Sequence, residues 1–264
     1  MIPDRNFSAI DEPDLANSDT SEWIAVLPLG AHEQHGPHLP FETDAIIADG
    51  IACRLAGAID PEVPVTFLPT ERIGYSIEHM DVEGTQSLSY DEAIEKWIGI
   101  GERLFALGIR KMLLLNAHGG NSPLMTIVAT ELRVRFSMLC VATAWTRFLI
   151  PGDVFTHEEK AFGIHGGDIE TSVMLALAPE TVDMGKAEDF GSFQSELADT
   201  TKYLRAYGQH AFGWKMRDLN PKGVTGNASI ATAAKGEALI LQALHGLSEL
   251  LVDMHEFDLS HFDR

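Results

Sequence analysis

The sequence predicts an α/β fold in which helices cover both faces of a mainly parallel β-sheet. Two observations predict it: short apolar runs typical of buried strands recur along the 264 residues, and stretches with apolar residues at helical spacing separate them. Strands that alternate with helices form parallel sheets, because each connection crosses back over one face of the sheet. The length is sufficient for one large core, so we expect a single domain over residues 1–264.

Four runs are predicted as strands, at residues 23–29, 63–68, 111–115 and 138–144. Four helices are predicted at residues 44–55, 90–107, 121–136 and 230–254. The second helix begins with Ser89 and Glu92, a capping-box pattern in which each side chain satisfies a free backbone amide. The third begins with Asn121 and has Pro123 in its first turn, where no backbone N–H is needed.

Two segments lack these patterns. Residues 1–20 are polar and acidic, and we interpret them as an N-terminal extension. Residues 179–226 contain glycine, proline, aspartate and scattered aromatic residues without helical or strand periodicity. An irregular stretch of this length is typically a lid, an oligomer contact or an excursion over an active site.

Charge and cysteine content restrict the partners and the compartment. Thirty-nine acidic and 19 basic residues give a formal net charge of −20, which disfavours binding to nucleic acids and anionic membranes. No run approaches the roughly 18 apolar residues of a membrane span, and the N-terminus has no signal-peptide pattern. Cys53 and Cys140 lie in apolar stretches and are predicted to be buried thiols. We therefore expect a cytoplasmic protein without nucleic-acid or membrane partners.

Carboxylates and imidazoles gather after the predicted strands, the first group within the run AHEQHGPHLPFETD. They are Glu33, His35 and Asp44 after the first strand, His118 after the third, and His165 and Glu170 in a later segment that leads into an apolar helix. The carboxyl ends of parallel strands meet at one edge of the sheet, where such folds bind their ligands. We therefore expect these side chains to lie together.

Imidazole and carboxylate ligands together favour zinc, manganese or iron. Glu33 and His35 share a face, because alternate residues of an extended segment point the same way. One of these residues can bind one divalent ion and the other residue a second ion, with Asp44 bridging the two ions. Two ions about 3.5–4 Å apart hold a hydroxide between them and polarise a carbonyl group.

Each motif taken singly also has a purely structural interpretation. A Glu-x-His pair in a loop is more often solvated than ligating, and we predict that His38 and Glu42 are solvated. His118 alone could belong to a capped turn, and Glu170 could lie near the positive end of a helix dipole. His79 could line the mouth of a pocket or lie at the surface. The joint placement of the motifs at strand ends favours a metal site.

The same motifs resemble those of the creatininase (creatinine amidohydrolase) family. The resemblance covers about residues 23–245 and rests on the following stretches: Leu27-Pro-Leu-Gly-Ala-His-Glu33-Gln-His35-Gly with Asp44, Asn116-Ala-His118-Gly-Gly-Asn121, Gly84-Thr85 before Ser87-Leu88, and Glu170-Thr-Ser172. It implies a three-layer α/β/α fold and a centre of two zinc or manganese ions. It also implies hydrolysis of amide bonds in small, often cyclic, molecules by a homo-oligomer, commonly a hexamer.

One departure from the family pattern follows His118. Creatininases that act on creatinine have a Tyr-Glu pair there, in which the tyrosine contacts substrate and the glutamate binds metal. Here Gly119 and Gly120 occupy those positions, and Glu170 is the natural substitute for the carboxylate. The Gly-Gly form is shared with branches that resemble formamide deformylases, peptide-trimming enzymes of cofactor maturation and a hydrolase of cyclic keto-inositols. Creatinine is therefore not the expected substrate.

The resemblance implies that Glu33, His35, Asp44 and His118 are metal ligands. In our hypothesis, Glu33, Asp44 and His118 hold one ion. His35, Asp44 and Glu170 hold the other, so that Asp44 bridges the two.

The predicted activity is hydrolysis of a C–N amide bond in a small molecule. Backbone amides of Gly119 and Gly120 would stabilise the oxyanion, and His79 would contact the substrate. His165 would protonate the leaving nitrogen, in line with the family resemblance. Two alternatives stay open: hydrolysis of a C–C bond in a cyclic ketone such as a keto-inositol, and metal-dependent binding of a small molecule without turnover.

Overall fold

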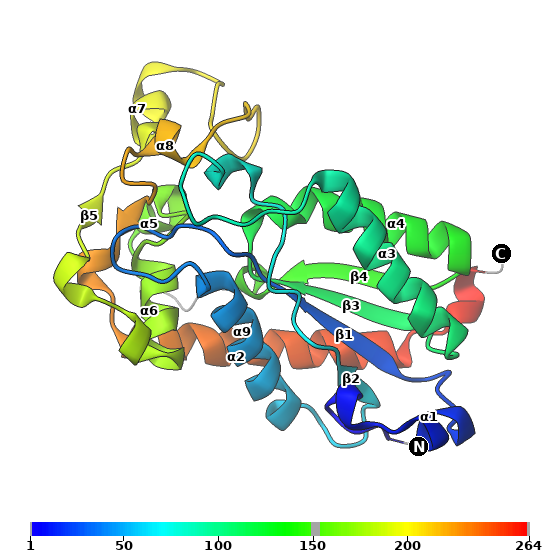
Figure 1. Cartoon of the computed structure of the whole chain (residues 1–264). Helices are drawn as coiled ribbons and strands as arrows, with labels where there is room; N and C mark the ends of the chain where they lie inside the picture. The colour runs from blue at the N-terminus through cyan, green and yellow to red at the C-terminus, as the bar shows by residue number, and fades with distance from the viewer. Residues whose placement is uncertain (1, 149–153, 263–264) are drawn as a thin grey trace.

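A four-stranded parallel sheet lies at the centre of the protein, whose computed structural model describes residues 2–148 and 154–262 (Figure 1). The strand order is β2-β1-β3-β4. The strands are β1 (Ile24–Leu29), β2 (Val65–Phe67), β3 (Lys111–Asn116) and β4 (Leu139–Ala144). Leu29 pairs with Asn116, so β1 and β3 end at the same edge of the sheet. All four predicted strands are confirmed.

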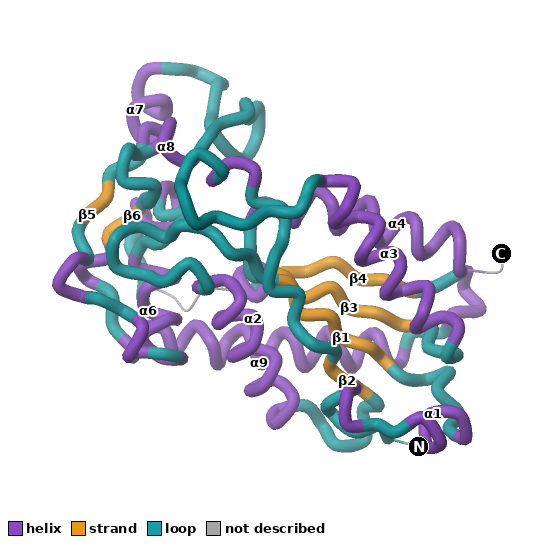
Figure 2. The backbone as a smooth tube through the Cα atoms, viewed as in Figure 1, coloured by secondary structure: helices purple, strands orange, loops and turns teal. Residues whose placement is uncertain are grey.

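Helices cover both faces of the sheet (Figure 2). One face carries α2 (Thr43–Ala58), α6 (Asp168–Leu177) and α9 (Ala233–Glu256). The other carries α3 (Tyr90–Ala106) and α4 (Ser122–Phe136). The predicted α/β fold with a parallel sheet between two helical layers is confirmed.

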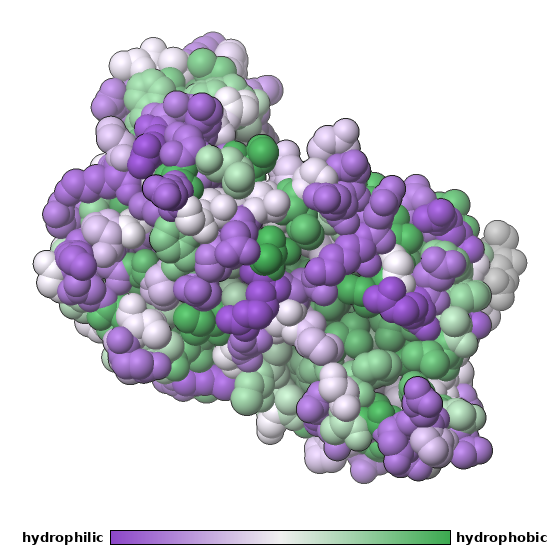
Figure 3. Space-filling model, in the orientation of Figure 1, coloured by the Kyte–Doolittle hydropathy of each residue, from purple (hydrophilic) through white to green (hydrophobic). Residues whose placement is uncertain are grey.

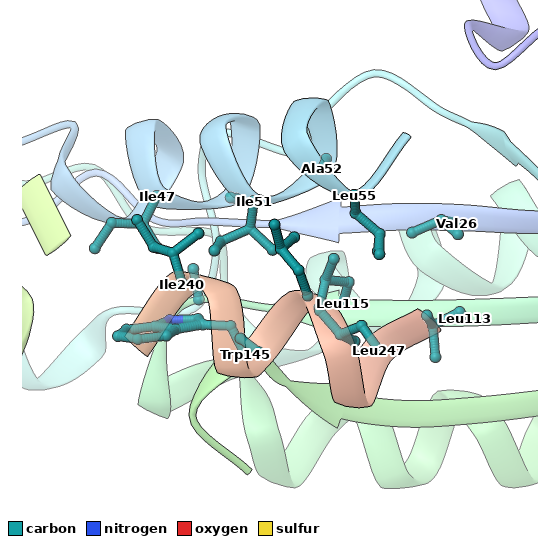
Figure 4. Close-up of a cluster of buried hydrophobic side chains, with 14 of the residues drawn as sticks. Val26, Ile47, Ile51, Ala52, Leu55, Leu113, Leu115, Trp145, Ile240 and Leu247 are labelled. Carbon is teal, nitrogen blue, oxygen red and sulfur yellow. The ribbon is translucent and has the colours of Figure 1, made fainter. Parts of the chain in front are cut away.

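The alternation of side chains along β1 divides the core into two clusters. Ile24 and Val26 pack with the α2 and α9 side, whereas Ala25 and Leu27 pack with the α3 and α4 side. Figure 4 shows the first cluster, in which side chains of α2 and α9 meet over Val26 and the β3 residues beside it. Burial of each large apolar side chain contributes roughly 1.5–3 kcal/mol to the free energy of folding. The two clusters therefore fix the position of the sheet edge from which the following loops extend.

The helix boundaries follow the capping residues. At α3, Ser89 accepts a hydrogen bond from the amide of Glu92, and the Glu92 carboxylate accepts one from the amide of Ser89 (2.9 Å). The long C-terminal helix α9 begins at Ala233, three residues after the predicted start, because Thr232 caps its N-terminus by accepting from the amide of Lys235.

The N-terminal extension is docked on the sheet edge. It contains the short helix α1 (Glu12–Asn17). The Arg5 carbonyl accepts a hydrogen bond from the amide of Phe67 in β2 (2.8 Å), and the Arg5 guanidinium donates to the carbonyl of Val63 (2.8 Å). The extension therefore protects the exposed edge of β2.

Residues 179–226 form a small region of short helices and strands beyond the carboxyl ends of the sheet strands, which the arrowheads mark in Figure 1. The elements are β5 (Asp189–Phe190), α7 (Phe193–Thr200), α8 (Met216–Leu219) and β6, which begins at Gly226 (Gly226–Asn227). This region has its own apolar cluster around Leu197, Met216 and Leu219. The short helix α5 (His157–Phe162) precedes it.

The two cysteines are less buried than predicted. Cys53 is exposed rather than buried, because Ile51 and Leu55 occupy the core side of α2 and Cys53 lies on the opposite side. Cys140 is half-buried, and burial raises the pKa of its thiol to about 12.

Within the described ranges, no helix combines the length and the apolar character needed to cross a bilayer.

Candidate metal centre

Several loops meet where β1 and β3 end, and two asparagines hold them together. The Asn121 side chain donates to the carbonyl of Gly30 (3.1 Å) and accepts from the amide of Tyr75 (2.9 Å). It also donates to the side-chain oxygen of Asn116 (3.1 Å), which accepts from the amide of His118 (3.1 Å). The bonds to Gly30 and Tyr75 join segments that lie more than 40 residues apart in the sequence.

Glu33, His35, Asp44 and His118 form a buried cluster at this edge, each with at most 5% of its surface exposed. Nδ1 of His118 lies 3.1 Å from Oε1 of Glu33 and 3.3 Å from Oδ2 of Asp44. Nε2 of His35 lies 3.2 Å from Oδ1 of Asp44. Asp44 therefore directs one oxygen toward each histidine, as a bridging carboxylate would.

Hydrogen bonds to backbone carbonyls orient three histidine rings. Nδ1 of His35 contacts the carbonyl of Glu33 (2.9 Å), Nε2 of His118 that of Tyr75 (2.9 Å), and Nε2 of His165 that of Gln34 (2.7 Å). Each carbonyl accepts the proton of one ring nitrogen, so the other nitrogen faces the carboxylates and is the one that could bind a metal ion. This is the arrangement that orients histidine ligands in metal sites.

The charges of the cluster stabilise one another. Burial disfavours the charged forms of His35 and His118, but attraction to the carboxylates of Asp44 and Glu33 is stronger than this effect. It raises the pKa of His35 to about 9 and that of His118 well above its usual value. Burial likewise opposes ionisation of Glu33 and Asp44. The positive charge of His118 nevertheless lowers the pKa of Glu33, and His35 lowers that of Asp44. Both carboxyl groups are therefore ionised at neutral pH.

The carboxylates carry too few hydrogen bonds for their burial. Neither oxygen of Glu33 accepts a hydrogen bond of acceptable geometry within the described part of the chain, and neither does Oδ2 of Asp44. Buried carboxylates normally have charged or hydrogen-bonding partners, because an unpaired buried charge is costly. Groups of three ligand atoms also converge here: Glu33, His35 and Asp44; His35, His165 and Glu170. The donor set fits zinc, manganese or iron.

His165 and Glu170 reach the same cluster from the loop before α6 and its first turn. Nδ1 of His165 lies 3.6 Å from Oε1 of Glu33, and its ring stacks on that of His35 with centroids 4.1 Å apart. The Glu170 carboxylate accepts a hydrogen bond from the amide of Gly166 (2.6 Å). Burial raises the pKa of Glu170 to about 7, although the nearby His35 opposes the rise.

His79 and Glu78 complete one side of the cluster. His79 is buried, not at the surface, and its Nε2 lies 3.3 Å from Oε1 of Glu33; burial lowers its pKa to about 4. Glu78 was not predicted. Its Oε1 lies 3.6 Å from Nε2 of His118, and burial raises its pKa. The one sequence signal for Glu78 was its position beside His79.

Gly119 and Gly120 follow His118 in a short 3₁₀ turn. A Cβ atom at Gly120 would collide with the Tyr75 carbonyl, with Nε2 of His118 (2.5 Å) and with Oε1 of Glu78 (2.7 Å). At Gly119 no atom lies within 4 Å of an added Cβ. The Glu78 carboxylate thus occupies space that a side chain at position 120 would need.

The prediction that His38 and Glu42 are solvated is right for one of them. Glu42 is exposed. His38 is buried: its Nε2 donates to the hydroxyl of Thr171 (2.9 Å), and its ring stacks on Phe190. Burial lowers the pKa of His38 to about 4, so it is a neutral structural residue beside the cluster.

A cavity of about 460 Å³ opens over the cluster. Its polar side comprises Glu33, Glu78, His79, His118 and His165, with Gly119 and Gly120 beside them. Its apolar side comprises Ile77, Ile164, Tyr207, Trp214 and Met216. His35, Asp44 and Glu170 do not line it and lie behind Glu33 and His165. The cavity size is typical of a small-molecule site.

The chain is similar to known hydrolases. A mycofactocin precursor peptide peptidase of Mycobacterium ulcerans is 30% identical over 228 residues, covering 84% of this chain and 82% of the relative. A 2-amino-5-formylamino-6-ribosylaminopyrimidin-4(3H)-one 5'-monophosphate deformylase of Methanobrevibacter smithii is 29% identical, covering 64% and 70%. A solved Bacteroides fragilis protein described as a creatinine amidohydrolase superposes with a TM-score of 0.78 at 25% identity, covering 98% and 99%.

The family model described as creatinine amidohydrolase matches residues 8–251. This range includes the sheet, the cluster of histidines and carboxylates, and the cavity wall. Together with the shared fold, the match shows that the chain belongs to the creatininase family of hydrolases.

Proposed function

We propose that the protein hydrolyses a C–N amide bond in a small molecule with two divalent metal ions, zinc or manganese, with iron also suited to the ligands. The observation that carries the proposal is the pair of buried carboxylates, Glu33 and Asp44, which lie between His35 and His118. Both oxygens of Glu33 and Oδ2 of Asp44 have no hydrogen-bond partner among the described residues. Membership in a family of amidohydrolases supports it.

Five side chains would hold the ions: Glu33, Asp44 and His118 for one, and His35, Asp44 and Glu170 for the other. When bound, two such ions supply a water molecule of lowered pKa as the nucleophile and polarise the carbonyl group of the substrate. Glu170 would replace the carboxylate that the family's creatinine-cleaving members carry at the position of Gly120.

His165 would transfer the proton. Its Nε2 is occupied by the carbonyl of Gln34, and burial keeps its pKa well below the usual value, so Nδ1 is an unprotonated base on the wall of the cavity. Nδ1 would take a proton released as the C–O bond forms and pass it to the nitrogen as the C–N bond breaks. The products are a carboxylic acid and an amine.

The rest of the polar wall would bind the substrate. Backbone amides of Gly119 and Gly120 would stabilise negative charge on the carbonyl oxygen. His79, neutral because of its burial, would contact the substrate beside Glu33.

Metal content and product analysis test the proposal. Protein purified without added metal or chelator is expected to contain about two ions per chain, and incubation with amides should release amine and acid in equal amounts. A new carboxylate without nitrogen release, from a cyclic ketone, would replace the proposal by C–C hydrolysis. A ligand that binds and returns unchanged over hours would replace it by simple binding.

We also propose that the protein is a homo-oligomer, with a hexamer as the expected form. Apolar side chains gather on the face between α3 and the N-terminal extension (Figure 3). A hollow there is lined by Phe7, Leu27, Leu68, Pro69, Ile100, Leu104 and Leu107, together with the polar residues Ser8, Glu71 and Arg103. Apolar patches of this kind often mark contacts between proteins. Sedimentation velocity tests the proposal, and a monomer at micromolar concentration would contradict it.

A further inference from the structure

The apolar side of the cavity is large enough to select a substrate group. The volume of about 460 Å³ corresponds to roughly fifteen water molecules at about 30 Å³ each. An amide group at the polar wall therefore leaves room for a further group of the substrate against the apolar side chains.

Two aromatic rings of this side are held in fixed positions. The indole N–H of Trp214 donates to the carbonyl of Ala206 (2.7 Å), and the hydroxyl of Tyr207 donates to the carbonyl of Ala161 (2.8 Å). The polar atoms of both rings are thus satisfied by the backbone, so the rings offer apolar surface to the cavity. Rigid aromatic side chains bind a flat apolar group with little loss of conformational freedom.

In the part of the chain that the structure describes, the apolar side of the cavity has no cationic side chain that could bind a phosphate. Among the described residues that line it, none is lysine or arginine, whereas Glu33 and Glu78 contribute carboxylates. Phosphate recognition normally uses arginine, lysine or a helix N-terminus. A phosphorylated group placed against the apolar side would lose its hydration without gaining a counter-charge.

An adjacent hollow contains two cations that lie outside the cavity. It shares Tyr207 with the cavity and is lined by Lys202 and Arg205. The guanidinium of Arg205 is already engaged: it donates to the carbonyl of Leu204 (2.7 Å) and to the hydroxyl of Thr201 (3.1 Å). These bonds use only Nη1 of Arg205, but neither cation lies on the cavity wall, and Trp214 does not line the adjacent hollow.

We infer that the substrate is an amide with an apolar, preferably aromatic, group on the amine side, and that phosphorylated amides are rejected. The inference rests on the proposed amide hydrolysis. It separates this chain from its deformylase relative, whose name specifies a 5'-monophosphate. Trp214 and Tyr207 are the residues that determine the preference.

A matched set of amides tests the inference. Benzylamine, methylamine and phosphoethanolamine are each used as formyl and acetyl amides, so that only the group beyond the scissile bond changes. Wild-type kcat/KM is expected to be about tenfold or more higher for the benzyl amides than for the methyl amides. It is expected to be lowest for the phosphoethanolamides.

Three variants assign the preference to the cavity wall. Trp214→Ala should lower the ratio of benzyl to methyl kcat/KM about tenfold, and Trp214→Phe should restore most of it. Tyr203→Ala is the matched control, since Tyr203 is an exposed aromatic residue of the same region that does not line the cavity. Ile77→Lys adds a cation at an exposed position of the wall. It should raise kcat/KM for the phosphoethanolamides about tenfold relative to the benzyl amides.

A binding measurement separates failure of this inference from failure of the proposed function. Calorimetry measures binding of the ketones in which CH₂ replaces the amide N–H of the benzyl and methyl acetamides. One outcome is that no amide is hydrolysed, but the benzyl ketone binds more tightly than the methyl ketone to the proteins with an aromatic ring at position 214 and not to Trp214→Ala. In that case the proposed amide hydrolysis is wrong and the preference for an aromatic group is right. Equal rates for benzyl and phosphoethanol amides, or an unchanged ratio in Trp214→Ala, would overturn the inference.

Discussion

The buried cluster at the sheet edge and the aromatic wall of residues 179–226 are built in different ways. The cluster takes its side chains from four separate segments, and the two asparagines that join its loops are themselves buried. The wall takes Tyr207, Trp214 and Met216 from one segment with a small apolar core of its own.

This difference indicates a division of roles. Ligands must be held within about 0.5 Å to bind metal ions, which requires anchoring to the main core. A specificity wall needs only apolar surface in roughly the right place, so it can be carried by a loop region that changes without disturbing the metal centre. The following predictions test that division, starting with the variant expected to have the largest effect.

Asp44→Asn is expected to remove both metal ions and to lower the rate of hydrolysis by more than about a thousandfold. Loss of a residue that only supports a metal ligand typically lowers activity about 10- to 100-fold. The larger effect is expected because Asp44 contacts both His35 and His118. Elemental analysis and amide turnover measure the effect. Asp49→Asn is the control on the same helix, where Asp49 is exposed and pairs only with Arg72 among the described ion pairs. Full turnover in Asp44→Asn would show that the cluster is not the metal centre.

Glu170→Ala is expected to lower metal content from about two ions per chain toward one and to reduce turnover about a hundredfold, because one ion loses a ligand. Glu180→Ala, an exposed position just after α6, serves as the control. If Glu170→Ala retains both ions, the ligand in place of Gly120 must be sought elsewhere. Glu78 is then the first candidate, and Glu78→Gln should be measured alongside.

Zinc affinity of chelator-treated protein is expected to rise between pH 6.5 and pH 9. His35, with a pKa raised to about 9, and Glu170, with a pKa raised to about 7, hold protons below these values. A metal ion must displace them, so fewer protons compete as pH rises, and each one contributes up to about tenfold in affinity per pH unit. Competition against a chelator of known affinity measures the slope, and a flat profile would contradict the assignment of His35 as a ligand.

The same protons predict a stability trend for the metal-free protein. The pKa of His35 in the folded protein lies above its usual value of 6.5. Its contribution to the free energy of unfolding is therefore fully present below about pH 6.5 and is lost as pH rises through about 9. Chemical denaturation at several pH values, with chelator present, checks the direction; a gain in stability over this range would be the opposite result.

Gly120→Ala and Gly119→Ala form a matched pair within the cluster. Gly120→Ala is expected to cost about 1–3 kcal/mol of stability through overpacking and to weaken zinc binding about tenfold, since the added Cβ meets His118 and Glu78. Gly119→Ala adds a Cβ with no atom within 4 Å and should leave stability and zinc affinity unchanged. Equal effects of the two variants would mean that position 120 is not closely packed.

Leu219→Ala is expected to have the smallest effect on the metal centre. Leu219 belongs to the apolar cluster of residues 179–226, so its loss should loosen the wall and change KM a few-fold while metal content stays at its wild-type value. Leu247→Ala in the core beside the sheet provides the comparison, with an expected loss of about 2–5 kcal/mol in global stability. Loss of metal from Leu219→Ala would show that wall and centre are not separable.

The predicted strands and helices lie within three residues of the observed ones, because their signals are local. The capping residues at Ser89 and the alternation of apolar residues in β1 depend on neighbours a few positions away. The placement of Glu33, His35, Asp44 and His118 together also followed from sequence, since parallel strands must end at a common edge. Their roles as ligands stay a prediction, as does the single-domain organisation.

Other features depended on contacts between distant segments. His38 is buried because Thr171 and Phe190, more than 130 residues away, close over it. Glu78 lies at the cluster because the turn that carries it packs on Gly120.

The sequence by itself thus determined the sheet, its helical layers and the edge at which carboxylates and imidazoles collect, since these follow from the spacing of apolar residues along the chain. Only the tertiary structure decided that Tyr207 and Trp214 line the cavity over the cluster and that none of the described residues lining it is lysine or arginine. The physical reason is that a cavity wall is defined by which segments pack against each other, and residues 179–226 have no periodic pattern from which that packing could be inferred.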